Sequence, residues 1–539
     1  MSFSSLYVGA TGVVAHGDRM QVVANNLANI NTVGYKKGDA QFADLISKQM
    51  ASGSARYQSG ANQISQIGMG VAIGEVRTLF NEGGIENTNT VTDLAIAGNG
   101  FFGVRNPNGT GSTGASHYTR AGNFRFNTDA YLVDPHDFRL QGYQVDRETG
   151  QVSTTVSDVQ LPYEDITIGG VETRVVQSAP RATTGIEMIT NLDALATDHY
   201  TSSTDPFFGM LAAYNGSLSN SAIPFEEGLP AYSSSLNVYD SDGNKQDLTV
   251  YFDPVSTTDI SNAAAGHSYW EYLIAMPGAS DGSSAYGTSS AGLAGVGVMT
   301  FNGLGELVDH TAFSLNAASG AGGKSLGSWT PSTFALDGTP QFSYTFGSNG
   351  AAVGDTQSVA MNFGLTSASS SWLSGAGTAA GVGLNASNLP GLAETEKGLR
   401  STTSYDSGSA TLFQNQDGYT SGYLLNTSVD REGFLNGIFT NGQTEQLYQI
   451  SMYRFTSEWG LNRAGNNNFL ATDASGTAIA GVAEDRGRGT MQQNSLEMSN
   501  VDMAEEFANM ILTQRGYQAN TKVITTSNTL LNTTISIKR

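Results

Sequence analysis

Three short stretches of the sequence carry glycines or acids at spacings that resemble binding motifs. In GNGFFG, the residues Gly98, Gly100 and Gly103 satisfy the G-x-G-x-x-G pattern of dinucleotide sites. Such a site needs a helix after the glycines and an acid about 20 residues further on. Here the strand-like FFGVRN follows, and the next acid is Asp129. We therefore predict no cofactor at these glycines.

The other two motifs are also incomplete. AASGAGGKS, around Lys324, resembles a phosphate loop, but Ala318 stands where the first glycine is required and no helical pattern follows. DSDGNKQD, from Asp240 to Asp247, resembles a calcium loop, but its glycine is misplaced and its closing glutamate is missing. We interpret the first as a surface loop and the second as a hairpin turn, so no metal is predicted.

Residues that could carry acid–base or nucleophilic chemistry are scattered. There is no H-x-x-x-H pair among the six histidines, which are His16, His117, His136, His199, His267 and His310. Acidic pairs such as Glu226 and Glu227 could in principle serve glycoside hydrolysis, the main enzymatic alternative, although adjacent acids on a turn usually face solvent. The absence of cysteine excludes disulfides, thiolate catalysis and cysteine-ligated metals. We therefore expect a protein that is not an enzyme.

Composition and charge narrow the class further. The net charge of −22 and the lack of any basic stripe argue against nucleic acid as a partner. The sequence has no run of about 18 apolar residues, so no membrane span is predicted. The N-terminus lacks the features of a cleaved signal peptide. With 65 glycines and only 14% charged residues, much of the surface must consist of small, uncharged polar groups, which suit strands and turns.

Helical patterning, which would position any site, is concentrated at the two ends of the chain. Apolar residues recur at seven-residue spacing, with intermediates, at Leu6, Val13, Met20, Val23, Leu27 and Ile30. This spacing predicts a coiled-coil seam. The run QVVANNLANINTVGYKK adds Asn25, Asn26 and Asn29, which we expect to specify register at some cost in stability. Gly34 is expected to turn the chain out of the helix.

The C-terminal stretch repeats this pattern. Its seam comprises Met503, Phe507, Met510, Tyr517, Ile524 and Leu531. Asp502 can accept from the free amides of the first turn while Glu505 reaches back, as in a capping box. A helix from Asp502 to Ile535 would be about 50 Å long. Two such helices bury too little surface to be stable alone, so we expect them to pack together and against other subunits.

The sequence between the helices alternates short strands with turns rich in Gly, Asn, Asp and Ser. The predicted fold class is mainly β and multidomain, with N- and C-terminal α-helices forming a coiled-coil and the middle of the chain outermost in a nested arrangement. The predicted parts are a helical domain (1–30 with 502–539), an extended connector with a short helix at 42–50 (31–70), an inner β domain (71–165 with 415–490) and one or two outer β domains (166–414).

Several stretches resemble the flagellar rod and hook protein family. NNLANINTVGYKK is similar to the family's Asn-rich helix end, and LEMSNVDMAEEFANMILTQRGYQANTKVI to its closing signature. LAIAGNGFFGV, YTRAGNFRFN and LQGY resemble its inner β domain, and GYLLNTSVDREGFLNGIFTNGQ resembles the return half of that domain. The block from about 183 to 390 resembles the outer hook domain. Rod relatives lack most of such a region, so its size favours hook over rod.

The resemblance implies a structural subunit that polymerises into a flexible helical tube, transmits torque from rod to filament as a universal joint, and encloses the export channel. It implies as partners further copies of the chain, the distal rod, the hook cap, the hook–filament junction proteins, the hook-length-control protein and the export apparatus, with no nucleic acid and no direct membrane insertion. The implied location is the extracellular flagellar hook and basal body, reached by type III export without a cleaved signal peptide.

Alternatives to a hook subunit remain. One is a distal rod or other flagellar axial protein. Another is a phage-tail or adhesin fibre, which should show longer internal repeats and gives no reason for capped seams at both ends. The third is a secreted glycan hydrolase, which would need a signal peptide and a pair of acids in a cleft.

Overall fold

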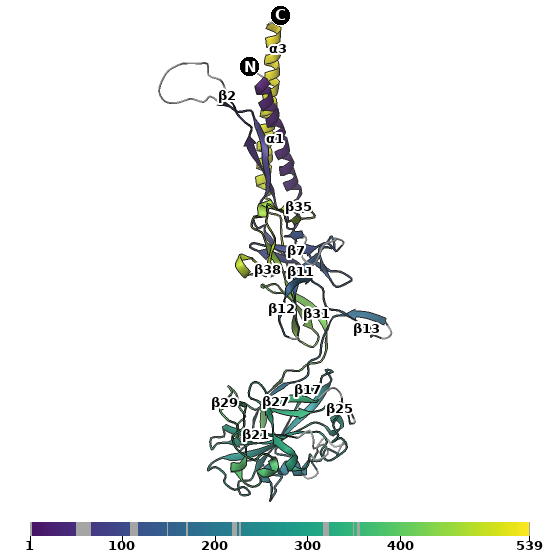
Figure 1. The fold of residues 1–539 in the computed structure, drawn as a ribbon, viewed down its shortest axis with the longest axis vertical. Coiled ribbons are helices and arrows are strands. Elements are labelled where there is room, and N and C mark those ends of the chain that lie inside the picture. Colours follow the sequence, from purple (N-terminus) through teal and green to yellow (C-terminus); the bar gives the residue numbers. More distant parts are fainter. Residues whose placement is uncertain are drawn as a thin grey trace, which may run out of the picture. The chain divides into compact units, whose positions relative to one another are not determined.

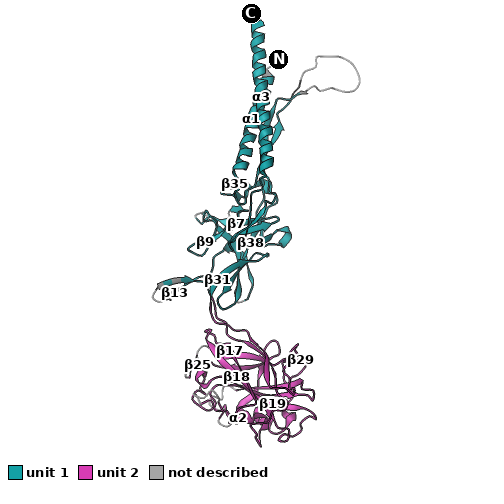
Figure 2. Cartoon of the chain, turned by 180° about the vertical axis from the view of Figure 1, so that it is seen from behind, with its two compact units in different colours: residues 1–177, 423–539 teal, residues 178–422 magenta. Residues whose placement is uncertain are grey.

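The computed structural model describes residues 3–49, 66–107, 117–147, 149–168, 171–217, 224–225, 228–315, 323–348, 350–352 and 356–537. The chain divides into two compact units (Figure 2). Unit 1 comprises residues 1–177 and 423–539, and unit 2 comprises residues 178–422. The middle of the chain therefore forms a unit of its own, while both ends contribute to the other.

Two long helices dominate one end of unit 1. The helices α1 (Phe3–Ala28) and α3 (Met503–Ile537) lie side by side in both views (Figures 1 and 2). At the start of α3, the backbone N–H of Glu505 donates to Oδ1 of Asp502 at 2.9 Å, and Glu505 and Glu506 place acid where the helix dipole favours it. The expected mainly β protein with its terminal helices packed together is confirmed.

A β-hairpin, not a helix, follows α1. The strand β1 (Gly38–Asp44) pairs antiparallel with β4 (Val71–Thr78), and β2 (Lys48–Gln49) pairs with β3 (Gln66–Ile67). The predicted helix at 42–50 is therefore wrong over its described residues; Met50 lies outside them. A helix of that length would be marginal alone, whereas pairing with β4 satisfies the backbone and lets Phe42 pack edge-on against His16.

The rest of unit 1 is a β body built around a 14-stranded sheet. Segments from both ends of the chain interlock in it, because β6 pairs with β38, β5 with β39, and β11 with β33. Its elements are β5 (Ile85–Asn87), β6 (Leu94–Ala97), β7 (Phe101–Arg105), β8 (His117–Thr119), β9 (Arg125–Phe126), β10 (Leu132–Val133), β11 (Arg139–Val145), β12 (Val152–Asp158), β13 (Glu164–Ile168), β14 (Val171–Val175), β15 (Gln177–Ser178), β31 (Gly422–Val429), β32 (Phe434–Phe439), β33 (Thr444–Ile450), β34 (Met452–Arg454), η7 (Glu458–Gly460), β35 (Asn462–Gly465), β36 (Asn468–Leu470), β37 (Ile479–Gly481), η8 (Asp485–Gly487), β38 (Thr490–Gln493) and β39 (Ser495–Glu497).

Buried side chains from both segments form the core of the β body. Its members include Leu94, Phe102, Leu140, Leu447 and Ile450. Gly98 and Gly100 of GNGFFG make the turn between β6 and β7, with φ of +103° and +135°, while Gly103 lies within β7. Such backbone angles are open to glycine and strained for other residues, so the motif serves the turn geometry.

Unit 2 contains a six-stranded and a five-stranded sheet, with orders β17-β18-β19-β20-β21-β22 and β23-β24-β27-β16-β30. DSDGNKQD forms the β17–β18 turn, where Oδ1 of Asp240 accepts from the N–H groups of Asp242 and Asn244. The elements of unit 2 are β16 (Gly185–Asn191), η1 (Pro206–Phe208), α2 (Gly209–Ala213), β17 (Tyr232–Tyr239), β18 (Lys245–Val255), β19 (Ser268–Ala275), η2 (Gly278–Ser280), β20 (Leu293–Phe301), β21 (Leu307–Leu315), η4 (Leu326–Ser328), β22 (Trp329–Pro331), β23 (Thr333–Phe334), β24 (Pro340–Tyr344), β25 (Gly347–Ser348), β26 (Ala351–Ala352), β27 (Gln357–Asn362), β28 (Leu365–Ser367), η5 (Ala379–Gly381), η6 (Ala386–Asn388), β29 (Thr395–Lys397) and β30 (Ala410–Gln416).

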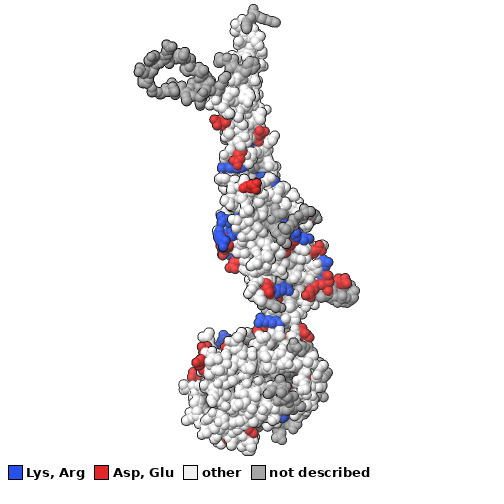
Figure 3. Space-filling view, viewed as in Figure 1, with Lys and Arg blue, Asp and Glu red and all other residues white. Residues whose placement is uncertain are grey.

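Charged side chains are sparse and unevenly placed. Figure 3 shows them mostly on the β body of unit 1, whereas the visible faces of the helix pair and of unit 2 are largely uncharged. Among the described residues, no helix is both long and apolar enough to span a membrane.

Candidate assembly interface

The contact between α1 and α3 is built on glycines. A Cβ added at Gly12 would lie 2.5 Å from Oδ1 of Asn520, and one at Gly516 would lie 2.5 Å from Cε1 of His16. A Cβ added at Gly9 would lie 3.0 Å from Cγ1 of Ile524. Side chains of each helix therefore fill notches that only glycine leaves in the other. The seven-residue pattern of large apolar residues gives no sign of these notches.

The helix α3 has an inverted distribution of polarity within one chain. The side chains that it buries are polar, namely Glu506 and Thr513. Its exposed large apolar residues are Met503, Phe507, Ile511, Leu512, Tyr517, Val523, Leu530, Ile535 and Ile537, with Leu512 63% exposed. On α1, Tyr7 and Val14 are also exposed. An apolar surface of this extent is typical of an interaction site.

The structure divides the residues of the predicted seams. In the N-terminal seam Val23 is buried, while Leu6, Val13, Met20, Leu27 and Ile30 are partly buried. In the C-terminal seam Met510, Ile524 and Leu531 are partly buried, whereas Met503, Phe507 and Tyr517 are exposed. The α1–α3 contact thus uses one side of each apolar pattern and leaves the other side open.

Asn26 ties three segments of unit 1 together. Its side chain is 1% exposed, and its Nδ2 donates to O of Gly38 at 2.9 Å and to Oε2 of Glu506 at 3.3 Å. Its Oδ1 accepts from the N–H of Gly38 and from the hydroxyl of Tyr35. A buried amide with this many partners fixes one arrangement of α1, β1 and α3.

The other two asparagines act locally at the end of α1. Nδ2 of Asn29 donates to the backbone oxygen of Asn25 at 2.8 Å, and Nδ2 of Asn25 donates to the hydroxyl of Tyr35 at 3.4 Å. Gly34 then has φ of +67°, and a Cβ there would lie 2.5 Å from N of Ala121. Both its backbone angle and its surroundings therefore require glycine.

A buried ionic cluster, Lys36, Glu497 and Arg120, anchors the helix ends to the β body. Nζ of Lys36 lies 2.5 Å from Oε1 of Glu497, and a nitrogen of the Arg120 guanidinium lies 3.2 Å from Oε2. Further bonds reach the backbone, because Lys36 donates to O of Asn81 and Arg120 to O of Gly98. Burial lowers the pKa of Lys36, against the opposing effect of Glu497.

Nearer the surface, Lys37 contacts the carboxylate of Glu505 at 2.9 Å. Glu505 of α3 is therefore ion-paired with Lys37, which directly follows Lys36 of the buried cluster. Sequence reasoning singled out the GYKK stretch but neither Lys36 nor its partners. Glu497 lies 461 positions from Lys36, and no local pattern links them.

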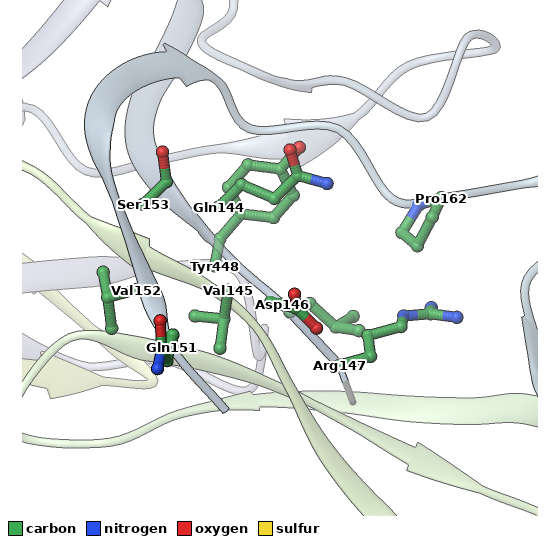
Figure 4. Close-up of a pocket in the computed structure, with 10 residues that line it drawn as sticks. Gln144, Val145, Asp146, Arg147, Gln151, Val152, Ser153, Pro162 and Tyr448 are labelled. Atoms are coloured by element: carbon green, nitrogen blue, oxygen red, sulfur yellow. The ribbon is translucent and has the colours of Figure 1, made fainter. Parts of the chain in front are cut away.

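A pocket of the β body lies beside the turn between β11 and β12. It has a volume of about 710 Å³. In Figure 4, Val152 and Gln151 lie on one side, Pro162 on the other, and Tyr448 and Gln144 between them. Asp146 contributes a carboxylate to the pocket and Arg147 a guanidinium. The described residues hold no cluster of three His, Cys, Asp or Glu with metal-site geometry.

Three of the residues considered for chemistry, His199, His310 and Lys324, have structural partners. Nδ1 of His199 lies 2.8 Å from Oδ1 of Asp253, and Nε2 of His310 lies 2.9 Å from the hydroxyl of Tyr272. Lys324 donates to O of Ala212 at 2.8 Å, at the end of α2. The pair Glu226 and Glu227, and Ala318 of the phosphate-loop comparison, lie outside the described residues.

Four family models match separate parts of the chain. They are "Flagella basal body rod protein" at residues 6–36, "Flagellar hook protein FlgE/F/G D1 domain" at 95–173, "Flagellar basal body protein FlaE D2 domain" at 221–419 and "Flagellar basal body rod FlgEFG protein C-terminal" at 492–537. The first and last coincide with α1 and α3. The two middle models fall on the β body and on unit 2.

Curated relatives match over almost their full length. The chain is 28% identical to the flagellar hook protein FlgE of Treponema pallidum and 29% identical to that of Borreliella burgdorferi, each with 99% of both chains covered. It is 27% identical to FlgE of Escherichia coli, with 100% of both covered. A crystal structure of Helicobacter pylori FlgE2 matches with a TM-score of 0.40 at 13% identity, covering 77% of this chain and 100% of that one.

Proposed function

The chain belongs to the flagellar rod and hook protein family, and from this premise we propose that it is the structural subunit of a flagellar hook. In this role, many copies polymerise into a helical tube that joins rod to filament. The full-length similarity to hook proteins favours this function over a rod protein. It also favours it over a fibre or a hydrolase.

The observation that carries the proposal is the inverted polarity of α3. The single chain buries Glu506 and Thr513 of this helix and leaves an apolar surface in water. Complete burial of a large apolar side chain in an interface stabilises the assembly by about 1.5–3 kcal/mol relative to leaving it exposed. We therefore assign the exposed face, which includes Phe507, Ile511 and Tyr517, to contacts with neighbouring copies. The notches between α1 and α3 fix how each copy presents that face.

The polar face of α3 is also suited to burial. Hydroxyls in its C-terminal half donate to backbone oxygens of the same helix, as in Thr521 to Tyr517, Thr529 to Thr525, Thr533 to Thr529 and Thr534 to Leu530. Because these donors are already satisfied, a neighbour can cover them without leaving an unpaired group. Threonine is a weak helix former, so we expect this half to depend on neighbours for its stability.

Unit 2 suits a joint that bends. When a tube curves, subunits on its inner side approach and those on its outer side separate. Surfaces with few charges and small, wet contacts slide at low cost, whereas a large apolar interface would hold one spacing. We propose that unit 2 provides such contacts and that the tube transmits torque as a universal joint.

The wider setting follows from the same family assignment. We propose that the protein acts outside the cell, in the hook of the basal body, after type III export without a cleaved signal peptide. Its partners would be other copies of itself, the distal rod, the hook cap, the hook–filament junction proteins, the hook-length-control protein and the export apparatus. The helix pairs would surround the export channel.

Polymerisation of purified subunits tests the proposal. Subunits are brought to polymerise with an excluded salt such as ammonium sulfate, and tubes are measured by sedimentation and negative-stain electron microscopy. Ile511→Asp, at an exposed position of α3, should abolish tubes while the circular dichroism of the β units stays unchanged. Leu27→Asp and Ile524→Asp, in the two predicted seams, should do the same.

The matched control is Thr395→Asp, which adds the same charge at an exposed polar position of β29 in unit 2, outside the helices. This variant should form tubes at about the same threshold concentration of subunit as the wild type if the apolar face of α3 decides assembly. Normal tubes from Ile511→Asp would contradict the assignment of that face.

A further inference from the structure

We propose that Trp459 of one copy inserts into the pocket beside the β11–β12 turn of a second copy. We name this the knob–pocket contact. The inference rests on the proposed function, since it states where two copies of a polymerising subunit meet. It concerns the β body rather than the helices.

Trp459 is unusually exposed. It is one of four tryptophans in the chain, and 65% of its surface is accessible, whereas Trp270 and Trp329 are buried. Trp372 is partly buried against the core of unit 2. A large aromatic side chain left in water is informative, and tryptophan is enriched where protein interfaces gain most of their binding energy.

The loop that carries Trp459 is held in place. The backbone oxygen of Gly460 accepts from the hydroxyl of Thr472 at 2.5 Å. A Cβ at Gly460 would lie 2.4 Å from N of Ser475, so two backbone segments are in direct contact. Leu461 is buried in an aromatic cluster. A side chain presented by such a loop loses little freedom on binding, which favours affinity.

The pocket offers a suitable receptor. Its volume of about 710 Å³ is within the range of about 300–1,000 Å³ that is typical of binding sites. Exposed apolar groups come from Val152 on one side and Pro162 on the other, with the ring of Tyr448 between them (Figure 4), whereas Val145 and Leu447 are buried beneath. An indole ring would contact these groups on both faces.

The polar groups of knob and pocket are complementary as well. An indole N–H is a donor only and needs an acceptor when buried. The amide oxygens of Gln144 and Gln151 line the pocket and can accept it. The Arg77 guanidinium lies 5.9 Å from the ring centre of Trp459 and would arrive with it, where Asp146 supplies a carboxylate at the pocket.

Knob and pocket lie at different ends of the same body. Trp459 belongs to η7, which directly precedes β35, and its neighbour Arg77 lies on β4 beside α1. Figure 1 shows β35 at the helix end of the β body and β12 toward its other end. A contact between two different surfaces of identical subunits is heterologous, and it builds an open helical filament when the rotation between copies does not close a ring. Such a contact suits a helical array.

The test compares polymerisation thresholds of full-length variants. Trp459→Ala removes the knob, and Val152→Trp fills the pocket from an exposed position. Each should raise the threshold concentration by at least about tenfold, as expected for loss of a central aromatic contact. The double variant should have no higher threshold concentration than the single variants, because both substitutions remove the same contact.

The matched controls are Leu336→Ala and Val308→Trp, which change exposed apolar positions of unit 2. Their threshold concentrations should stay within about twofold of the wild-type value.

Tryptophan fluorescence gives a second readout. On polymerisation, wild-type emission should move to shorter wavelength and lose acrylamide quenching, and Trp459→Phe should remove this change. Wild-type thresholds for both Trp459→Ala and Val152→Trp, or full quenching of Trp459 in the polymer, would overturn the knob–pocket contact while leaving the hook function intact. A wild-type chain that formed no polymer would instead contradict the proposed function, and this contact with it.

Discussion

The imidazole of His16 occupies the place of a missing side chain at Gly516. A Cβ at position 516 would lie 2.5 Å from Cε1 and 2.7 Å from Nε2 of that ring. A residue larger than glycine at position 516 therefore requires the His16 ring to move or the helices to separate. Because His16 also packs against Phe42 of β1, the same ring sets the spacing of α1, α3 and the hairpin.

Gly516→Ala should accordingly weaken the helix pair. Overpacking of a tight contact costs about 1–3 kcal/mol, which exceeds the helix propensity that alanine gains. Circular dichroism at 222 nm during thermal unfolding should show an earlier loss of helix. The matched control is Gly17→Ala on α1, where an added Cβ meets nothing within 4 Å. That change should leave the helix unchanged or more stable, and equal behaviour of the two variants would contradict the notch.

The buried ionic cluster predicts a large effect from one neutral substitution. Glu497→Gln keeps the size of the side chain but leaves Lys36 and Arg120 buried without their anion. Loss of one partner of a buried ion pair costs about 3–5 kcal/mol. Urea unfolding of the monomer should show this loss in unit 1. Glu505→Gln, which removes the partner of Lys37 at the surface, should cost about 1 kcal/mol or less.

His310 predicts a pH dependence in unit 2. Burial lowers the pKa of its imidazole from 6.5 to about 3. Its Nε2 faces the hydroxyl of Tyr272, while Nδ1 has no hydrogen-bond partner among the described residues, so a second ring proton would be unsatisfied. Between these two pKa values the unfolded chain binds a proton that the folded chain does not. Stability is therefore lost as the pH falls through this range, and the loss levels off below about pH 3.

His310→Gln should remove that dependence. The free energy of unfolding of the wild type, relative to this variant, should fall between about pH 6.5 and 3 with a slope approaching 1.4 kcal/mol per pH unit. The difference isolates His310, since buried acids such as Glu271, whose pKa burial raises, are present in both proteins. Parallel curves for the two proteins would contradict the assignment.

Removal of unit 2 tests its part in bending. Residues 178–422 can be replaced by a short linker, because the N–H of Leu424 donates to O of Val176 at 2.9 Å and the two ends lie together. The shortened subunit should still polymerise, since α1, α3 and the β body are retained, but its tubes should lose wild-type curvature. Unchanged curvature and handedness in electron micrographs would show that unit 2 does not set the bend.

The fold could be predicted where its signals are local. Asp502 and the acids after it marked the start of α3, and Gly34 marked the exit from α1, because caps and left-handed turns depend on a few adjacent residues. The helix predicted at 42–50 failed because a distant strand, β4, supplied partners that helix periodicity cannot reveal.

The candidate interface could be predicted only in part. Seven-residue spacing identified stripes on α1 and α3, yet it could not say which side of a stripe meets the other helix. In the folded chain, α1 and α3 contact each other on the side where Gly12 and Gly516 allow close approach. Met503 and Phe507 therefore remain exposed. A seam of small residues carries little hydrophobic signal, which is why the pattern missed it.

The sequence by itself determined the two terminal helices, the β-rich middle and the family, because periodicity, turn residues and signature stretches are properties of neighbouring positions. Only the tertiary structure brought Lys36 to Glu497 across 461 positions and Asn26 to Glu506 across 480. Such pairs depend on the path of the whole chain. Burial then makes each of them necessary, since a charge or amide removed from water must find its partner within the fold.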